Sequence, residues 1–415
     1  MNLNIRSEIN PLRLVITHKP GIEHQYITPE NLIEKIKENS SIKDNPDYLL
    51  FDDLIHVNKA QEEHKSLYKI LHNFTDGNCY EITDLLNVVL KDNKLKKLMT
   101  TECINLEKKI YNKTINNNKL YELESEKLIN VLLSGFYKEE KIFSYPLPNL
   151  IFTRDIAVCI GNTILITWST KDVRRRENII AKYVLNNHPM FKSLNIYDFN
   201  KKHPNLNIEG GDIIVFDNDR ICIGVSERTP LASIDKISSL IFKEGFKKII
   251  AIDMPKKRAL MHLDTIFTRI NENEVLVFPP MLDNFSKDIY IYNKNGKNEI
   301  LKNTNLAEVL REDGLNINFI KCGSDSKIMQ QREQWTDGAN AFALAPGKII
   351  GYDCNTYTLK ELKKFGYKVI TSNEYNNSYK EYNKMKEKFI ITMKGSELSR
   401  GRGGPRCLTL PLFRI

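Results

Sequence analysis

The segment IEGGDIIVFDNDRICIGV, residues 208–225, contains two apolar runs joined by a short polar turn. Glu209-Gly210-Gly211-Asp212 precedes the first run, and the Asp-Asn-Asp sequence of 217–219 separates it from the second. Apolar runs separated by such a turn predict a β-hairpin. Residues 234–247 then have the spacing of a helix. The segment therefore predicts a polar entry, a hairpin and a crossover helix.

The same pattern occurs about four times along the chain. Polar residues precede strand–turn–strand patterns at 151–167, 208–225, 261–278 and 339–352, and helical segments such as 359–365 separate these units. Recurrence at intervals of roughly 50 to 75 residues is typical of repeated α/β units arranged around an axis. We therefore expect the polar residues at the strand entries to meet at one end of that axis.

Two further segments complete the predicted organisation. Residues 12–18 have the composition of a strand that ends at Lys19-Pro20-Gly21. Between residues 57 and 136 the chain lacks proline and carries leucines at helical spacing. This second segment predicts an inserted bundle of helices, with an ordinary surface helix pair as the alternative.

The composition excludes several classes of protein. Apolar residues make up 41% and charged residues 27% of the 415 residues, without the run of roughly 18 to 20 apolar residues that a membrane helix requires. Residues 1–10 lack the apolar core of a secretory signal, and the seven cysteines lack CxxC spacing. We therefore expect a cytoplasmic protein with reduced thiols, no structural metal and no membrane contact.

The net charge of +9 does not by itself indicate nucleic-acid binding. The lysines are interspersed with acidic residues and asparagines, for example in 91–97 and 380–388. Such runs are more typical of a solvated face, and no RNA- or DNA-binding motif accompanies them.

The closing segment RGRGGPRCLTLPL, residues 400–412, combines a nucleophile with a tight loop. Three glycines lie within four positions, and Cys407 then opens a short apolar run that resembles a strand. Arg400, Arg402 and Arg406 lie close to the cysteine in sequence, and positive charge favours the thiolate. The alternative is a mobile basic tail with a chance cysteine.

If the repeated units converge, five residues form one coherent chemical site. Cys407 would be the nucleophile, His262 a proton shuttle, and Asp155, Glu209 and Asp264 a carboxylate site for a planar cation with several donors, such as a guanidinium. Each has a structural alternative: an ion pair at a strand end, a turn, or a hydrogen-bonded core histidine. Their joint occurrence favours the catalytic interpretation.

The motifs that carry these residues resemble those of the arginine deiminases over essentially the whole chain. In chain order they are SEI (7–9), LLFDD (49–53), PLPNLIFTRD (146–155), RRRE (174–177), IEGGD (208–212), GVSERT (224–229), MHLDT (261–265), REQWTDGAN (332–340) and RGRGGPRCLTLPL (400–412). The family belongs to the guanidino-modifying (pentein) superfamily. The resemblance implies one catalytic domain, 1–415, folded as an α/β five-bladed ββαβ propeller with a helical insertion at 57–136.

The resemblance also implies an activity: metal-free, cofactor-free hydrolysis of L-arginine to L-citrulline and ammonia, the first step of the arginine dihydrolase pathway. Cys407 would form a covalent S-alkylthiouronium, with His262 as acid and then base. Asp155 and Asp264 would hold the guanidinium, and Glu209 would pair with His262 and the substrate.

The remaining implied roles concern substrate binding. Arg174 and Arg228 would meet the α-carboxylate and Arg402 would lie near the mouth of the pocket, while Asn149, Phe152 and Gly401 would complete it. The resemblance also predicts a homo-oligomer, dimer or tetramer.

Two alternatives remain open at this point. One is a related guanidino-group enzyme, such as an agmatine deiminase or an amidinotransferase. The presence of both Arg174 and Arg228 favours a substrate with a carboxylate over agmatine. The other is a catalytically silent paralogue that binds arginine or a partner, although none of the expected site residues is missing.

Overall fold

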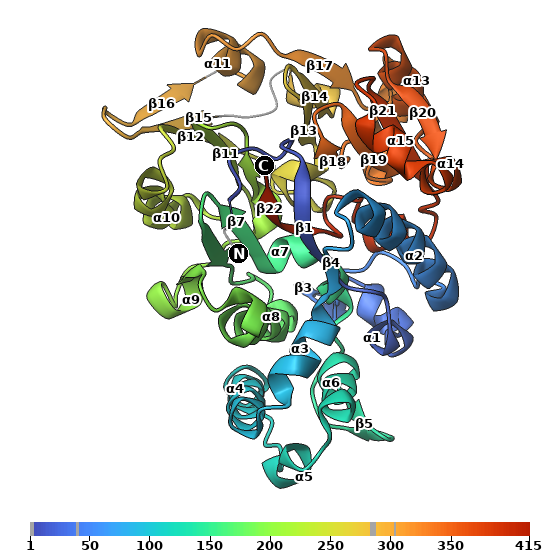
Figure 1. Cartoon of the computed structure of the whole chain (residues 1–415). Coiled ribbons are helices and arrows are strands. Elements are labelled where there is room, and N and C mark those ends of the chain that lie inside the picture. The colour runs from blue at the N-terminus through green and yellow to red at the C-terminus, as the bar shows by residue number, and fades with distance from the viewer. Residues whose placement is uncertain (1–3, 39–40, 283–287, 303) are drawn as a thin grey trace.

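The computed structural model describes residues 4–38, 41–282, 288–302 and 304–415. Segment 1–10, which is predicted to lack a secretory signal, is described only from residue 4 onward. The chain has a mixed α/β fold in which several small sheets, each with helices beside it, surround a central region (Figure 1). Within the described ranges the strands form seven separate sheets and no continuous closed barrel.

Five of the sheets share one three-stranded arrangement. In each, the first strand pairs antiparallel with the second, and the second pairs parallel with the third. In this strand order the sheets are β22 (Leu410–Arg414), β1 (Leu12–Thr17) and β4 (Cys79–Glu81); β7 (Ala157–Ile160), β8 (Thr163–Ile166) and β9 (Asn195–Asp198); β10 (Ile213–Val215), β11 (Arg220–Val225) and β12 (Lys248–Asp253); β13 (Phe267–Asn271), β14 (Glu274–Val277) and β17 (Asn318–Lys321); and β18 (Phe342–Ala345), β19 (Lys348–Tyr352) and β21 (Phe389–Met393).

The hairpins predicted at 151–167, 208–225, 261–278 and 339–352 are confirmed, as is the strand predicted at 12–18. A fifth unit joins the two ends of the chain, because β22 pairs with β1. Its strand β22 begins at Leu410, three positions after Cys407, so the thiol lies in a turn and not in the predicted strand-like run.

The parallel pairs need crossover connections, and helices provide them. In chain order the crossover helices are α2 (Val57–Phe74), α8 (Arg175–Asn187), α10 (Leu231–Lys243), α11 (Leu306–Glu312) and α13 (Thr356–Lys364). Other strands extend two sheets or form separate hairpins: β15 (Asp288–Asn293), β16 (Glu299–Lys302) and β20 (Lys368–Thr371), then β2 (Lys35–Glu38) with β3 (Ser41–Asp44), and β5 (Phe136–Tyr137) with β6 (Glu140–Lys141). The other helices outside 57–136 are α1 (Ile22–Gln25), α7 (Thr153–Ile156), α9 (Phe199–Lys202), α12 (Lys327–Trp335), α14 (Ser372–Asn377) and α15 (Tyr379–Lys384).

The segment 57–136 is rich in helices but not uniformly helical. It contains α2 and also α3 (Ile82–Leu90), α4 (Asn93–Tyr111), α5 (Asn117–Tyr121) and α6 (Ser125–Ser134). Strand β4 interrupts it and pairs with β1, which makes α2 the crossover helix of that sheet. Helices α3 to α6 extend from the body of the protein (Figure 1), where α3 and α4 contact α8.

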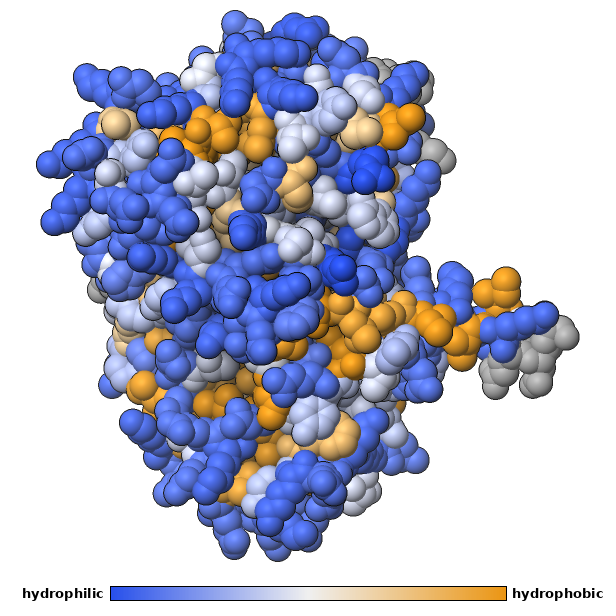
Figure 2. All heavy atoms as spheres, turned by 90° about the vertical axis from the view of Figure 1, so that its right-hand side faces the viewer, coloured by the Kyte–Doolittle hydropathy of each residue, from blue (hydrophilic) through white to orange (hydrophobic). Residues whose placement is uncertain are grey.

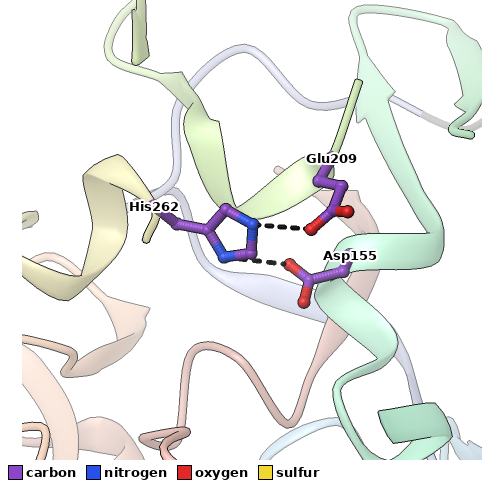
Figure 3. Close-up of side chains that lie close together, drawn as sticks. All are labelled: Asp155, Glu209 and His262. Carbon is purple, nitrogen blue, oxygen red and sulfur yellow. Dashed lines mark hydrogen bonds and ion pairs between the residues drawn. The ribbon is translucent and has the colours of Figure 1, made fainter. Parts of the chain in front are cut away.

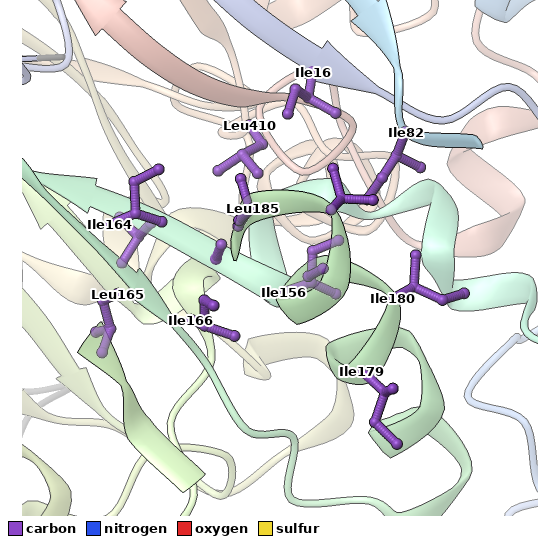
Figure 4. Close-up of a cluster of buried hydrophobic side chains, with 14 of the residues drawn as sticks. Ile16, Ile82, Ile156, Ile164, Leu165, Ile166, Ile179, Ile180, Leu185 and Leu410 are labelled. Atoms are coloured by element: carbon purple, nitrogen blue, oxygen red, sulfur yellow. The ribbon is translucent and has the colours of Figure 1, made fainter. Parts of the chain in front are cut away.

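The largest hydrophobic cluster joins several of these elements (Figure 4). Ile16 of β1 and Leu410 of β22 contribute to it from the two ends of the chain, and Ile164 of β8 and Ile180 of α8 contribute from the middle. Burying each such side chain stabilises the fold by roughly 1.5–3 kcal/mol. The cluster therefore fixes the β7 and β22 sheets relative to one another.

The face shown in Figure 2 is largely hydrophilic, with several hydrophobic patches between hydrophilic side chains. No helix in the described ranges combines the length and apolar content that a membrane span requires.

Candidate active site

Each repeated sheet is preceded by a short turn or helix that carries a polar site residue. Asp155 lies in α7 before β7, Glu209 lies before β10, His262 and Asp264 before β13, Asn340 before β18, and Cys407 before β22. Hydrogen bonds link these turns, for example from the backbone N–H of Arg154 to the carbonyl of Cys407 at 3.2 Å. The structure thus brings together the five predicted catalytic residues and adds Asn340.

His262 lies between two carboxylates, Asp155 and Glu209, whose segments precede different sheets (Figure 3). Its Nε2 is 2.8 Å from Oε2 of Glu209, and its Nδ1 is 3.6 Å from Oδ1 of Asp155. The backbone N–H of Gly211 also donates to Oδ1 of Asp155, at 3.1 Å. A Cβ at position 211 would lie 2.6 Å from Nδ1 of His262, so only glycine allows this approach.

These contacts favour the protonated form of His262. Burial alone would lower its pKa, but Asp155 and the hydrogen bond that Nε2 donates to Glu209 outweigh burial and raise the pKa to about 9. Burial also disfavours the charged form of Glu209. Arg228 and His262 nevertheless hold the pKa of that carboxyl well below its usual range. At neutral pH the pair is therefore an imidazolium beside a carboxylate, which is suited to donating a proton.

Cys407 is buried beside Asp264 and Asn340. Its Sγ lies 3.6 Å from Oδ2 of Asp264. The side-chain oxygen of Asn340 accepts from the backbone N–H groups of Arg406 and Cys407 at 3.1 and 3.2 Å, and its amide donates to the carbonyl of Asp264 at 2.9 Å. Asn340 thereby fixes the Cys407 turn against the Asp264 turn.

The expectation that nearby arginines favour the thiolate is wrong, because other groups around Cys407 outweigh their effect. Burial, Asp264 and Asp155 raise the pKa of the Cys407 thiol well above its ordinary value, and Arg406 only partly opposes them. Arg400 is turned away and pairs with Asp53 at 3.1 Å. These surroundings therefore favour the neutral thiol.

Arg406 is neutralised by two carboxylates. Its Nη1 donates to Oδ2 of Asp264 at 2.6 Å and its Nε donates to Oε2 of Glu8 at 2.9 Å, while Nη2 also binds Glu8. All three side chains are buried. Arg406 thus holds Asp264 beside the thiol.

Arg174 is also engaged within the site. Its Nη1 donates to Oδ2 of Asp155 at 2.8 Å, its Nε to Oε2 of Glu177 at 3.0 Å, and its Nη2 to the carbonyl of Asn149 at 3.2 Å. These acceptors occupy the donors that were expected to meet a substrate carboxylate. Arg174 therefore orients Asp155 in the unliganded protein.

Arg228 and Arg402 are less fully paired. Nη1 of Arg228 lies 3.7 Å from Oε1 of Glu209, and its buried Nε has no hydrogen-bond acceptor among the described residues. Arg402 lies over the ring of Trp335, 3.8 Å from its centroid, donates to that residue's carbonyl, and adopts a left-handed φ of +66°. Its Nε is 3.6 Å from Oδ2 of Asp52.

A small cavity lies between these groups, with a volume of about 10 Å³. Its wall includes Asp155, Arg174, Arg228, His262, Arg402 and Cys407, together with Asn149, Phe152, Gly401, Leu50, Arg258, Met261 and Thr265. A space of this size holds about one water molecule.

Asp155, Glu209 and His262 also offer potential metal-ligand atoms within 4.8 Å of one another. Each imidazole nitrogen, however, faces one of the two carboxylates, and Nη1 of Arg174 lies 2.8 Å from Asp155 and 3.6 Å from Glu209. Ion pairs account for this cluster, and a metal ion would have to displace a guanidinium. The geometry suits a proton shuttle better than a metal site.

Three contacts that shape the site were not predicted. Asn340, Glu8 and Glu177 each bind a site residue or its neighbour. Asn340 occupies in the fourth unit the position that Glu209 and Asp264 occupy in theirs, so the repeat itself could have identified it. Glu8 and Glu177 lie within segments that match the family's motifs, but no pattern indicates their partners.

Comparisons with known proteins agree with this geometry. The model of the arginine deiminase family matches residues 136–414. The arginine deiminase of Listeria monocytogenes serovar 1/2a is 32% identical, over 99% of this chain and 98% of that protein. That of Mycoplasma capricolum subsp. capricolum is 33% identical, over 99% and 97%.

A solved structure is similar in fold. It is a dimethylarginine dimethylaminohydrolase in an adduct with S-methyl-L-thiocitrulline, with a TM-score of 0.50, 14% identity, and coverage of 96% of this chain and 99% of that one. At this identity the likeness concerns the fold alone.

Proposed function

Because this chain belongs to the arginine deiminase family, we propose that it hydrolyses L-arginine to L-citrulline and ammonia, with Cys407 as the nucleophile. The observation that carries the proposal is a buried thiol beside one carboxylate, facing a cavity that an imidazolium held by two further carboxylates also lines. Such a site is negative where a guanidinium would lie, and it supplies both a nucleophile and an acid.

The guanidinium would bind between Asp155 and Asp264. Oδ1 of Asp264 is buried and has no hydrogen-bond partner among the described residues, which leaves it ready to accept from a substrate N–H. Oδ2 of Asp155 is shared with Arg174, so a bound guanidinium would compete with or displace that contact. Both carboxylates would keep the central carbon electrophilic by holding the positive charge on the nitrogens.

The cationic substrate would also activate the nucleophile. A positive group placed near Asp264 and Asp155 would offset the two charges that keep the Cys407 thiol protonated, so the thiol would lose its proton to solvent when the substrate binds. The thiolate then forms a C–S bond to the guanidinium carbon. His262 donates its proton to the departing nitrogen, the C–N bond breaks, and ammonia and an S-alkylthiouronium result.

The second half of the reaction uses the same groups in reverse. His262, now neutral, takes a proton from water as the oxygen attacks the thiouronium carbon. The C–S bond then breaks, the electron pair returns to sulfur, and the hydroxyl gives its proton to the thiolate as the C–O bond becomes the ureido carbonyl of citrulline. Glu209 acts through His262, because it holds Nε2 and is not part of the cavity wall.

Arg228 is the strongest candidate for the α-carboxylate. It lines the cavity and has an unused Nε donor, whereas the donors of Arg174 are already bound to Asp155, Glu177 and Asn149. Arg402 lies on the cavity wall with its Nη groups on backbone carbonyls. An arginine binding a carboxylate favours arginine as substrate over agmatine, which lacks that group.

We infer a five-bladed ββαβ propeller for the whole chain, 1–415, as one catalytic domain. Five sheets with the same strand order and connections support this arrangement. Because β4 and α2 belong to the first blade, the inserted bundle would span 82–134 and not 57–136. The homo-oligomer, the cytoplasmic location and the absence of nucleic-acid partners remain predictions.

The decisive experiment follows the covalent intermediate. We expect acid-quenched enzyme with arginine to carry a thiouronium adduct on the peptide containing Cys407, and Cys407→Ser to lose both adduct and citrulline release while keeping its melting temperature. Citrulline formation near the wild-type rate by Cys407→Ser would exclude Cys407 as the nucleophile. Preferred turnover of agmatine would exclude arginine as the main substrate.

A further inference from the structure

Helix α2 is bound to the segment that leads to the cavity wall. Glu63 of α2 is buried, and its Oε1 accepts a hydrogen bond from the hydroxyl of Ser396 at 2.9 Å. Its Oε2 accepts from the backbone N–H of Glu397 at 3.1 Å and from that of Leu398 at 3.0 Å. One carboxylate thus binds three consecutive residues that are more than 330 positions away in the sequence.

No Lys, Arg or His in the described ranges forms an ion pair with Glu63. A buried carboxylate without a cation is unfavourable unless hydrogen bonds compensate for its lost hydration. The three residues of the segment supply those hydrogen bonds, so the carboxylate and the segment's conformation stabilise one another. A second contact has the opposite direction: the backbone N–H at His56, which precedes α2, donates to Oε2 of Glu397 at 2.8 Å.

The bound segment continues directly into the site. The turn Leu398–Gly401 follows it, and Arg402 comes next with its left-handed φ. Gly401 and Arg402 both form part of the cavity wall. A displacement of 396–398 would therefore move that wall while leaving His262 and its two carboxylates in place.

We propose that Glu63 is a positioning residue for substrate binding, which fixes the Gly401–Arg402 wall through residues 396–398. The inference rests on the proposed function and adds a residue that touches neither the cavity nor the reacting atoms. Because Cys407 is held separately by Asn340, loss of Glu63 impairs binding more than chemistry.

The hydrogen-bond geometry predicts how two substitutions differ. In Glu63→Gln the amide oxygen can occupy the place of Oε2 and accept from both backbone N–H groups, while the NH₂ group donates to the Ser396 hydroxyl. In Glu63→Ala all of these donors lose their acceptor. Glu62→Ala is the matched control, because Glu62 is an exposed glutamate on the same helix and its loss changes the charge equally.

The test is steady-state citrulline release by the four full-length proteins. Glu63→Ala is expected to raise the KM for arginine at least tenfold with kcat within about threefold of wild type. Glu63→Gln is expected to restore KM to within about threefold, and Glu62→Ala to resemble wild type. Equal KM values for Glu63→Ala and Glu62→Ala, or a fall confined to kcat, would overturn the proposal.

Two measurements separate this result from misfolding and from failure of the proposed activity. The first is arginine binding by calorimetry in the Cys407→Ser background, where Glu63→Ala should weaken binding at least tenfold and Glu63→Gln should not, whether or not the parent enzyme shows turnover. Unchanged binding would refute the role of Glu63.

The second measurement applies if Glu63→Ala does not fold. Ser396→Ala removes one of the hydrogen bonds to Glu63 and should raise the KM for arginine by a smaller factor. An unchanged KM would refute the proposal.

Discussion

Substituting Asp264 by asparagine separates the reactivity of the thiol from catalysis. Oδ2 of Asp264 lies 3.6 Å from Sγ of Cys407, and this carboxylate is the strongest charged influence that raises the pKa of the thiol. Removing its charge should make the thiolate easier to form. The same change removes a carboxylate that would hold the substrate guanidinium, so Asp264→Asn should be less active although its thiol ionises more readily.

The distance gives the size of the effect. Two unit charges 3.6 Å apart interact by about 5 kcal/mol at an effective dielectric constant near 20. Even if relaxation of Arg406 and entry of water leave only a third of this energy, the thiolate fraction at a fixed pH below the midpoint rises about tenfold. Arg406 keeps Glu8 as a partner in the variant, which limits its loss of stability.

Thiolate absorbance near 240 nm measures this ionisation without a reagent that must enter the cavity. Subtracting the matched Cys407→Ser protein from each spectrum cancels the other six cysteines and the tyrosines. We expect the titration midpoint of the thiol to fall in Asp264→Asn, together with a decrease of about a hundredfold or more in citrulline formation. A midpoint that is unchanged or higher would refute the electrostatic account of the buried thiol.

Two other predictions concern the cations of the site. Arg228→Ala should raise the KM for arginine by roughly tenfold to a hundredfold and leave kcat nearly unchanged, since it would meet a carboxylate remote from the reacting carbon; a fall in kcat at unchanged KM would contradict this. His262 gains a raised pKa of about 9 on folding, so its charged form adds at most about 3 kcal/mol of stability, complete below pH 6.5 and lost as the pH rises through 9. The stability advantage of wild type over His262→Gln in urea unfolding should therefore shrink between pH 6 and 9.5, and a constant or growing advantage would show that His262 is not held as a cation.

The repeated units were predictable because their cause is local. An apolar run, a polar turn and a second apolar run specify a hairpin wherever they occur, and each of the predicted hairpins is present. Strand β4 was not predicted because its three residues, Cys79–Glu81, are too few to show an alternating pattern. The strand also lies between two helices. Its pairing with β1 is a tertiary effect that changes the role of α2.

The candidate site was predictable in its members but not in its charges. Asp155, Glu209, His262, Asp264 and Cys407 were identified from their positions before predicted strands and from the family's motifs, and the structure brings them together. Ionisation of the thiol depends instead on distances between turns that lie far apart in sequence. Three neighbouring arginines suggested a thiolate, but each binds a partner that no local pattern identifies: Arg400 pairs with Asp53, Arg402 lies over Trp335, and Arg406 pairs with Glu8 and Asp264.

The neutral Cys407 thiol has a consequence for the proposed catalytic cycle. Burial and the carboxylates Asp155 and Asp264 keep the thiol protonated, which disfavours a reactive thiolate. In the proposed reaction, the guanidinium cation of arginine would offset the charges of the two carboxylates and release the nucleophile when its target is in place. Citrulline carries an uncharged ureido group, so its formation would remove the cation that the two carboxylates bind. The thiol would then recover its proton, and the electrostatic balance that favours binding of the cationic substrate would favour release of the neutral product.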